Sequence, residues 1–310
     1  MGYRKSLRIM LGNLKDKGSL IKTALSTNSH KSSVRSVILR ATTHGSSSLP
    51  SEHQIAAIIA IGLESHAGAC CCMQALMDRL NSTSDAFVAL KCLYTIHNII
   101  GKGSFGSADQ LSPYKCFHNS LAFRDHSDQE TWQMSEWVRW YAAILEQNLA
   151  VPKVLGYHHL YSNKKDKILS SLNSDLLKEI DVLVEFARQV GNRPDSLHLQ
   201  RNSLVYEVVR LVGEEYRLVQ REMGSRVAEL GARMTSLSLN ECTEFLNSLD
   251  RFEECKEGIC SLLVNRNTNA DLWDLVKESK AKLVAKIKEE ENVGKLTLVL
   301  KLQRGRSRVR

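Results

Sequence analysis

The sequence predicts an all-α protein arranged as an irregular helical solenoid. Its 310 residues include only 17 glycines and 4 prolines, whereas an all-β chain needs turn residues about every 8–12 positions. Apolar residues recur at intervals of three and four along most of the chain, which is the spacing of one helix face. No repeat of about 34 or 40 residues is detectable, so the expected helices are not copies of one unit.

Local signals place the first helices. Ser51 and Gln54 form a capping-box pattern, which predicts a helix start just after Pro50. Residues 85–100 are apolar on nearly all sides and predict a buried central helix. Residues 131–149 carry three tryptophans at helical spacing and predict another helix. The four prolines lie beside breaks in the apolar pattern, so we expect them to separate helices rather than to interrupt them.

The C-terminal half follows the same pattern. Residues 176–190 and 201–222 have helical periodicity, and Gly191 is a stop signal after the first of them. Ser238 and Glu241 form a second capping box. The highly charged segment 271–291 follows. Beyond it, leucines alternate with other residues at period two, but a lone strand has no partner, so we expect a flexible or weakly docked tail.

The charge is concentrated at the two ends of the chain. Of the net charge of +8, residues 1–40 carry +8, the last ten residues carry +5, and the part between them carries −5. An enzyme that acts on nucleic acids usually has basic residues throughout a groove. Basic residues at the two ends of the chain, with a mildly acidic middle, fit binding to an anionic membrane surface better. The alternative is that these basic residues are exposed to solvent and bind nothing.

Composition also excludes several classes of protein. The eight cysteines include no CxxC pair and no zinc-site spacing, and no signal peptide is present, so we expect reduced thiols in a cytosolic protein. No apolar run is long enough to span a bilayer. The Cys70–Cys72 triplet lies in an apolar stretch, where burial is a better account than S-acylation.

Two short motifs resemble functional signatures. Residues 101–106 match GxGxxG, but a helix precedes them instead of a strand, and no other kinase or dinucleotide-binding motif is present. Residues 1–6 match the N-myristoylation pattern, although Tyr3 is bulky for it. With no nucleophile, metal or acid–base constellation, we expect neither catalysis nor a cofactor.

Three stretches together carry a resemblance to a known family. Residues 14–44 form a lysine-rich segment that ends in Arg-Ala-Thr-Thr-His, residues 86–100 contain a buried Lys-Cys-Leu-Tyr-Thr-Ile-His pattern, and residues 123–125 are followed by Trp-Val-Arg-Trp-Tyr at 137–141. In content, order and spacing they resemble the ANTH-domain clathrin assembly proteins, particularly those of plants. The resemblance implies an ANTH-like right-handed superhelix of about ten helices.

The resemblance also implies a domain organisation. An ANTH-like helical domain is expected over residues 1–292, with an N-terminal part at about 14–160 and a C-terminal helical extension at about 165–292. A short basic tail, residues 293–310, follows.

The function that the resemblance implies is that of an adaptor on membranes. It is expected to bind phosphatidylinositol 4,5-bisphosphate on the cytosolic leaflet and to promote clathrin coat assembly during endocytosis or budding from the Golgi. R-SNAREs and adaptor complexes are further possible partners, and no specific nucleic acid is expected. The protein would then be peripheral on coated pits and vesicles.

The family's lipid site reads as a basic residue, nine residues, Lys, any residue, Lys or Arg, and His or Tyr. Arg40 and His53 fill the first and last positions, but Pro50 and Glu52 occupy the two lysine positions. Because each basic contact with an anionic lipid surface is worth about 1 kcal/mol, we expect weakened binding. Lys31 and Arg35, one helical turn apart, are candidates to assist.

Two alternatives remain open. The chain could be a scaffold that kept the fold, lost phosphoinositide specificity and binds proteins through its helices. Less favoured is an RNA-associated protein that uses its arginine-rich C-terminus. Asp175-Leu176-Leu177 and Asp271-Leu272-Trp273 look like adaptor or clathrin motifs, but both lie in expected helices, where packing explains the apolar residues.

Overall fold

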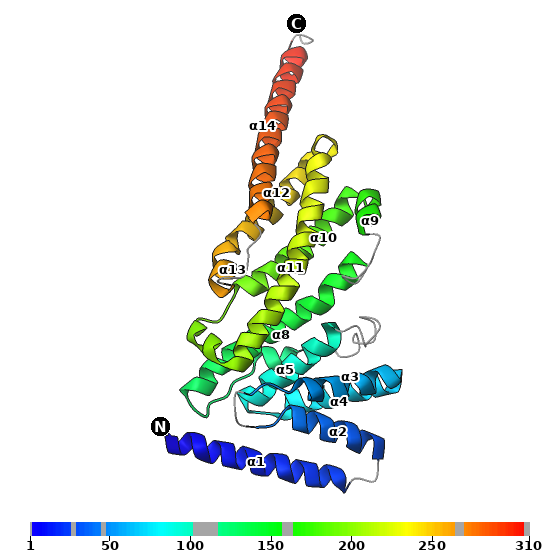
Figure 1. Ribbon diagram of the computed structural model, residues 1–310. Coiled ribbons are helices and arrows are strands. Elements are labelled where there is room, and N and C mark those ends of the chain that lie inside the picture. The colour runs from blue at the N-terminus through cyan, green and yellow to red at the C-terminus, as the bar shows by residue number, and fades with distance from the viewer. Residues whose placement is uncertain are drawn as a thin grey trace. The chain divides into compact units, whose positions relative to one another are not determined.

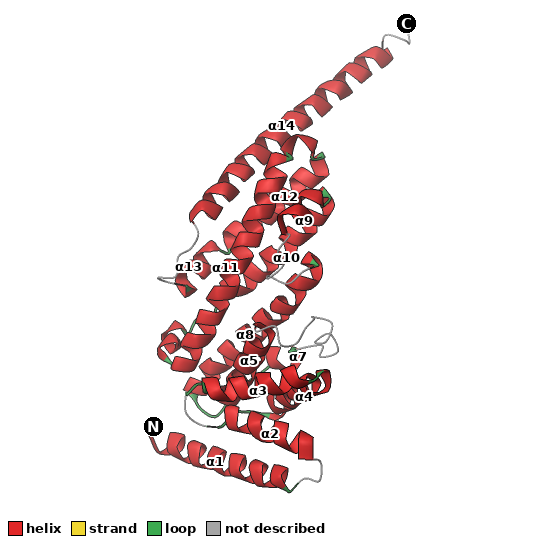
Figure 2. Cartoon of the chain, turned by 45° about the vertical axis from the view of Figure 1, so that its right-hand side comes forward, coloured by secondary structure: helices red, strands yellow, loops and turns green. Residues whose placement is uncertain are grey.

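The computed structural model describes the backbone of residues 2–25, 29–44, 48–101, 117–156, 164–263 and 270–306, and the side chains of 7–25, 31–44, 48–101, 117–156, 165–263 and 270–292. Within these ranges the regular structure is helical, without a strand (Figure 2), so the all-α prediction is confirmed. The elements are α1 (Gly2–Ala24), α2 (Ser29–Ala41), α3 (Glu52–Glu64), α4 (His66–Ser82), α5 (Ala86–Gly101), α7 (His118–Leu121), α8 (Gln129–Leu155), α9 (Lys164–Ser170), α10 (Asn173–Gly191), α11 (Ser203–Ala232), α12 (Leu239–Glu254), α13 (Lys256–Leu262) and α14 (Ala270–Arg306), with 3₁₀ turns at Leu197–Arg201 and Met234–Ser236.

The chain divides into two compact units, Met1–Lys153 with Asn192–Gly213, and Val154–Gly191 with Glu214–Arg310. The division therefore falls within α8 and α11, which contribute to both units. Residues 192–213 belong to the first unit, although they lie in the expected C-terminal extension. None of the helices in the described ranges combines the length and apolar character needed to cross a bilayer.

The first unit is built on a layered set of short helices. Helix α1 packs on α2, α2 packs on α3 and α4, and α4 packs on α5; α1 and α2 lie side by side (Figure 1). Helix α5 forms the core, with nearly every side chain buried, including that of Lys91. His97 Nδ1 lies 2.8 Å from Tyr141 Oη, which links α5 to α8. The predicted buried central helix is confirmed.

Local capping explains several helix starts. The Ser51 hydroxyl accepts from the backbone N–H of Gln54 at 3.2 Å, and the Gln54 side chain accepts from the Ser51 N–H at 2.8 Å. Ser238 and Glu241 form the same reciprocal pair at the start of α12. Both predicted capping boxes are therefore confirmed. The Asp125 carboxylate adds a long-range cap, because it accepts from the Ala86 N–H at 3.0 Å at the start of α5.

Pro152 does not separate helices as predicted, because it lies inside α8. It stands one turn before the helix end, where a missing N–H removes a single hydrogen bond. The buried side chains of Val151 and Leu155 anchor this last turn.

The backbone of the segment expected to be a flexible or weakly docked tail is helical, since α14 extends as far as Arg306. Extending an existing helix costs little for leucine, lysine and arginine, whereas an unpaired strand gains no hydrogen bonds.

The Cys70–Cys72 triplet is only partly buried. Cys72 is fully buried, whereas Cys70 and Cys71 are half-exposed. Three consecutive helical residues span about 200° around the axis, so they cannot all face one core. The expectation of burial is therefore wrong for two of the three cysteines. The GxGxxG segment beyond Gly101 lies outside the described residues.

The second unit packs α10 against α12 and α13, and α12 against α14. A Cβ atom on Gly258 would lie 2.3 Å from the carbonyl oxygen of Gly191, so α13 approaches the end of α10 as closely as glycine allows. Phe252 and Trp273 stack with ring centroids 4.6 Å apart. The guanidinium of Arg226 is fully buried between two carboxylates, 2.7 Å from Glu179 and 2.8 Å from Glu222.

Candidate anion-binding surface

Arg40 and His53 lie at neighbouring helix ends. Arg40 is in the last turn of α2 and His53 in the first turn of α3, and both side chains are exposed. The Gln54 side-chain amide donates to the Arg40 carbonyl at 3.0 Å, which holds the two helix ends together. Glu52 is exposed in the same turn as His53, and Pro50 is buried. This corner therefore presents two basic side chains together with a carboxylate.

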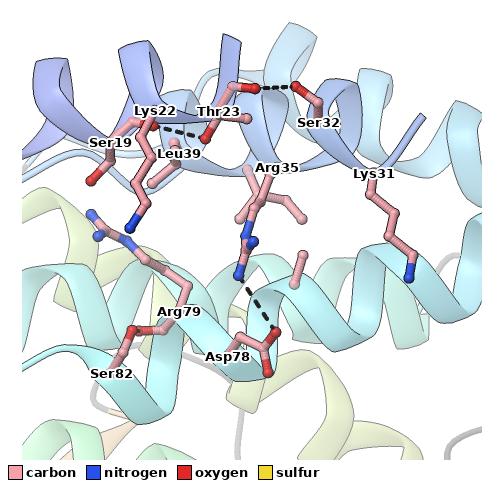
Figure 3. Close-up of a pocket in the computed structure, with 12 residues that line it drawn as sticks. Ser19, Lys22, Thr23, Lys31, Ser32, Arg35, Leu39, Asp78, Arg79 and Ser82 are labelled. Atoms are coloured by element: carbon pink, nitrogen blue, oxygen red, sulfur yellow. Dashed lines mark hydrogen bonds and ion pairs between the residues drawn. The ribbon is translucent and has the colours of Figure 1, made fainter. Parts of the chain in front are cut away.

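Lys31 and Arg35 lie elsewhere on α2. Both line a cleft of about 540 Å³ formed by α1, α2 and α4, which we call the α1–α2–α4 cleft (Figure 3). Neither Arg40 nor His53 lines it. Its lining includes four cations, four hydroxyl groups, one carboxylate and a few apolar side chains: Lys22, Lys31, Arg35 and Arg79; Ser19, Thr23, Ser32 and Ser82; Asp78; and Ile38, Leu39 and Ala75. The structure thus separates the four predicted residues into two pairs.

Hydrogen bonds fix the walls of the α1–α2–α4 cleft. The Ser32 hydroxyl donates to the Thr23 carbonyl and so ties the start of α2 to the end of α1 (Figure 3). The Thr23 hydroxyl donates to the Ser19 carbonyl at 2.7 Å. Because the hydroxyl protons of Ser32 and Thr23 are already donated to backbone carbonyls, recognition of an anion would fall mainly to the four cations.

Arg79 is held by a buried network behind the cleft. Its Nη2 atom lies 2.9 Å from a carboxylate oxygen of Asp16 and 3.1 Å from the Thr42 carbonyl. Asp16 also accepts from the backbone N–H of His44 at 2.6 Å and lies 2.7 Å from His44 Nδ1. The network joins α1, the segment after α2, and α4. Arg79 Nε is buried and has no hydrogen-bond partner among the described residues.

The same network shifts the ionisation of Asp16. Burial raises the pKa of this carboxyl, but the hydrogen bonds from His44 and the charges of His44 and Arg79 outweigh burial, so the pKa lies below its ordinary value. A Cβ atom on Gly12 would lie 2.4 Å from His44 Cβ, so α1 approaches this segment very closely. Asp16 and Gly12 therefore dock α1 on the rest of the first unit.

The Asp16→Asn variant should lower the free energy of unfolding by about 1–3 kcal/mol at neutral pH, because a buried charged hydrogen bond to Arg79 is lost. The stabilisation due to a depressed carboxyl pKa is fully present above the unfolded pKa, about 3.9, and disappears as the pH falls through the folded pKa. Urea unfolding between pH 5 and pH 3 should show the gap between wild type and variant closing. Asp78→Asn, which changes an exposed carboxylate, is the control. A gap that stays constant with pH would contradict this account.

The outer face of α1 is apolar and exposed. Its large side chains are between 45% and 79% accessible to solvent and follow one another at intervals of three, four or seven residues: Leu7, Leu11, Leu14, Ile21 and Leu25. We call them the α1 stripe. They lie opposite the buried Gly12, Asp16 and Thr23. Lys15 and Lys22 are exposed along one side of the stripe, and Lys17 is exposed along the other.

The sequence-based interpretation missed the α1 stripe, Lys22 and Arg79. Helical periodicity over residues 7–25 could have revealed the stripe. Nothing local could have paired Arg79 with residues of α1 and α2, because 63 positions separate it from Asp16. The two segments that look like adaptor or clathrin motifs are packed into the helical core, as predicted. Their apolar side chains are all buried: Leu176, Leu177, Leu272 and Trp273.

Comparison with known proteins identifies the fold family. The profile of the ANTH domain matches residues 33–263. Three proteins of Arabidopsis thaliana named "Putative clathrin assembly protein" are 36%, 30% and 27% identical to the chain. The matches cover 96%, 88% and 88% of this chain, and 85%, 84% and 98% of the respective relatives. The family profile thus spans most of a chain whose described elements are all helical, and the chain belongs to the ANTH domain family.

Proposed function

We propose that the protein is a peripheral membrane adaptor that binds phosphoinositide-containing cytosolic surfaces and takes part in clathrin coat assembly. The α1 stripe is the observation that carries this proposal. An exposed apolar helix face with lysines on both sides is the arrangement of helices that lie in the membrane interface. The helix also belongs to the most basic part of the chain, residues 1–40.

The energies involved suit reversible attachment. Complete burial of one leucine side chain is worth about 1.5–3 kcal/mol, and each lysine or arginine near an anionic surface adds about 1 kcal/mol. Partial burial of the stripe together with Lys15, Lys17 and Lys22 would therefore hold the protein on a membrane. Neither the apolar nor the basic contribution needs to suffice alone.

We assign phosphoinositide contacts to the four predicted basic residues. Arg40 and His53 face solvent at one corner of the unit, and Lys31 and Arg35 line the α1–α2–α4 cleft. The carboxylate of Glu52 beside His53 would repel phosphate, and the buried Pro50 supplies no charge. The corner formed by Arg40 and His53 is therefore the weaker of the two basic regions.

The role in coat assembly is supported by family membership and by the names of the relatives. Clathrin is accordingly the proposed coat partner, and R-SNAREs and adaptor complexes are further proposed partners. Clathrin-coated pits and vesicles at the plasma membrane or the Golgi are the proposed sites of action.

Co-sedimentation with vesicles tests the proposal. The chain should bind phosphatidylcholine vesicles that contain phosphatidylinositol 4,5-bisphosphate, bind vesicles with phosphatidylserine at equal charge less well, and dissociate as salt increases. Arg40→Ala should weaken binding severalfold, since one surface contact of about 1 kcal/mol is lost. Vesicles carrying the protein should also recruit purified clathrin, and bare vesicles should not.

The alternative of a protein-binding scaffold is favoured by one observation, the exposed Glu52 and buried Pro50 at two positions where the family has lysines. Absence of vesicle binding, or equal binding to any anionic lipid, would establish that alternative and overturn the phosphoinositide proposal. The side chains of the arginine-rich C-terminus lie outside the described residues.

A further inference from the structure

Trp132, in the first turn of α8, differs from the other tryptophans of the chain. Its side chain is 41% exposed, whereas Trp137, Trp140 and Trp273 are buried. A single exposed apolar residue is common on protein surfaces and by itself indicates no function. The residues around Trp132 therefore decide what its exposure means.

Two exposed basic side chains lie against the Trp132 ring. The guanidinium carbon of Arg124 lies 5.8 Å from the ring centroid, and the ring centroids of His126 and Trp132 are 5.2 Å apart. We call Arg124, His126 and Trp132 the Trp132 cluster. A guanidinium at this distance from an indole makes a favourable cation–π contact. The cluster thus presents a large amphipathic ring and a permanent positive charge side by side at the surface.

The loop that carries the cluster is held in place by hydrogen bonds. The Asp125 carboxylate accepts from the Ala86 N–H at 3.0 Å, and the Asp125 N–H donates to the Ser135 hydroxyl at 2.8 Å. Asp128 caps α8 by accepting from the Thr131 N–H at 2.9 Å. Because the backbone on both sides of the cluster is already ordered, binding through it would cost little conformational entropy.

A second guanidinium lies close to the cluster. Arg139 and Arg124 both donate to the Phe123 carbonyl, at 2.9 Å and 3.3 Å. Burial, together with the charge of Arg124, lowers the pKa of Arg139, and the charge of Glu136 acts in the opposite direction. Glu130 is half-exposed, and it lies two positions before Trp132, about 200° away around the helix axis. The side of α8 that bears Trp132 therefore suits an anionic partner.

The cluster adjoins the N-terminal end of the α1 stripe. Arg8 of α1 donates to the Asp128 carboxylate at 2.9 Å, and Asp128 lies one helical turn before Trp132. The Arg8 guanidinium also lies 5.7 Å from the centroid of the buried Phe87 ring. Figure 1 shows the start of α8 near this end of α1. Leu7, the sequence neighbour of Arg8, belongs to the stripe.

We propose that the Trp132 cluster is a second membrane contact of this chain, which places the indole among the lipid headgroups while Arg124 faces anionic lipid. The inference rests on the proposed function, because it takes the partner to be a membrane. Tryptophan is enriched at membrane–water interfaces, since its ring is apolar and its N–H stays hydrated. Contacts from both α1 and α8 would fix the orientation of the first unit on the membrane, which one helix alone could not do.

Tryptophan fluorescence tests the contact on the unmodified chain. Vesicles of phosphatidylcholine with phosphatidylinositol 4,5-bisphosphate should shift the emission to shorter wavelength, and phosphatidylcholine with brominated acyl chains should quench it. Both changes should disappear in Trp132→Phe, because the three remaining tryptophans are buried. This measurement does not depend on the stability of any variant other than that conservative one.

Co-sedimentation with the same vesicles measures the contribution to binding. Trp132→Ala should bind about 10-fold more weakly, because the exposed part of one large aromatic side chain no longer leaves water. Trp132→Phe should lose less. Tyr206→Ala is the matched control, since Tyr206 is an aromatic residue of the same unit, is 52% exposed and lies outside both the stripe and the cluster. It should bind like wild type. Circular dichroism checks that the variants fold.

The outcomes distinguish this contact from the proposed function. Vesicle binding with unchanged Trp132 emission, and with normal binding by Trp132→Ala, would overturn the contact, leave the membrane adaptor standing and point to a protein partner for the cluster. Trp132-dependent binding that is equal for phosphatidylserine vesicles of the same charge would support the contact and overturn the phosphoinositide proposal. Absence of binding to either kind of vesicle would overturn both.

Discussion

Replacing Leu11 and Leu14 with glutamate is expected to reduce binding to phosphoinositide vesicles by more than about 100-fold. Both leucines are mostly exposed, at 59% and 63%, in the centre of the α1 stripe. Each loses an apolar contribution of about 1.5–3 kcal/mol if the stripe enters the membrane interface. Each glutamate also adds repulsion from an anionic surface. Co-sedimentation at constant salt measures the loss.

Leu63→Glu provides a matched control for this double variant. Leu63 is 67% exposed on α3 and belongs to the same unit, but it lies outside the stripe. The control should bind vesicles like wild type, and both variants should have wild-type circular dichroism, because exposed positions contribute little to stability. Wild-type binding by Leu11→Glu/Leu14→Glu would show that α1 does not contact the membrane through this face.

Replacing Arg226 with leucine should destabilise the second unit by about 3–5 kcal/mol. The Arg226 side chain is fully buried, and it pairs with Glu179 and Glu222, which are also buried. Its loss leaves two carboxylates in a medium of low polarity without their counter-charge. Urea unfolding followed by circular dichroism should show a transition at clearly lower denaturant concentration.

Two further variants distinguish the charge effect from a loss of packing. Arg217→Leu changes an exposed arginine of the same helix and should alter stability by less than about 0.5 kcal/mol. The triple variant Arg226→Leu/Glu179→Leu/Glu222→Leu should recover most of the lost stability, because an apolar replacement removes the need for paired charges. Failure of the triple variant to recover would assign the destabilisation to packing of the arginine stem instead.

The predictions that succeeded depend on interactions between near neighbours in the sequence. The capping boxes at Ser51 and Ser238 link residues three positions apart, and the structure forms both. The apolar residues of 85–100 surround a helix on all sides, which predicted its central position in the core. At two places a local signal against a helix competed with the continuation of a helix already formed. These are Pro152 and the period-two leucines after residue 295, and at both the long helix continues.

Helical spacing also placed Lys31 and Arg35 on one face of a helix, and no tertiary information was needed for that pairing. Their separation from Arg40 and His53, and their convergence with Lys22 and Arg79, arose only when α1 and α4 packed against α2. The buried Asp16, His44 and Arg79 network sets that packing from three distant parts of the chain. Spacing along a helix follows from backbone geometry and can be read from neighbouring residues. The distance between side chains on different helices depends on how whole faces fit together, which no short stretch of sequence encodes.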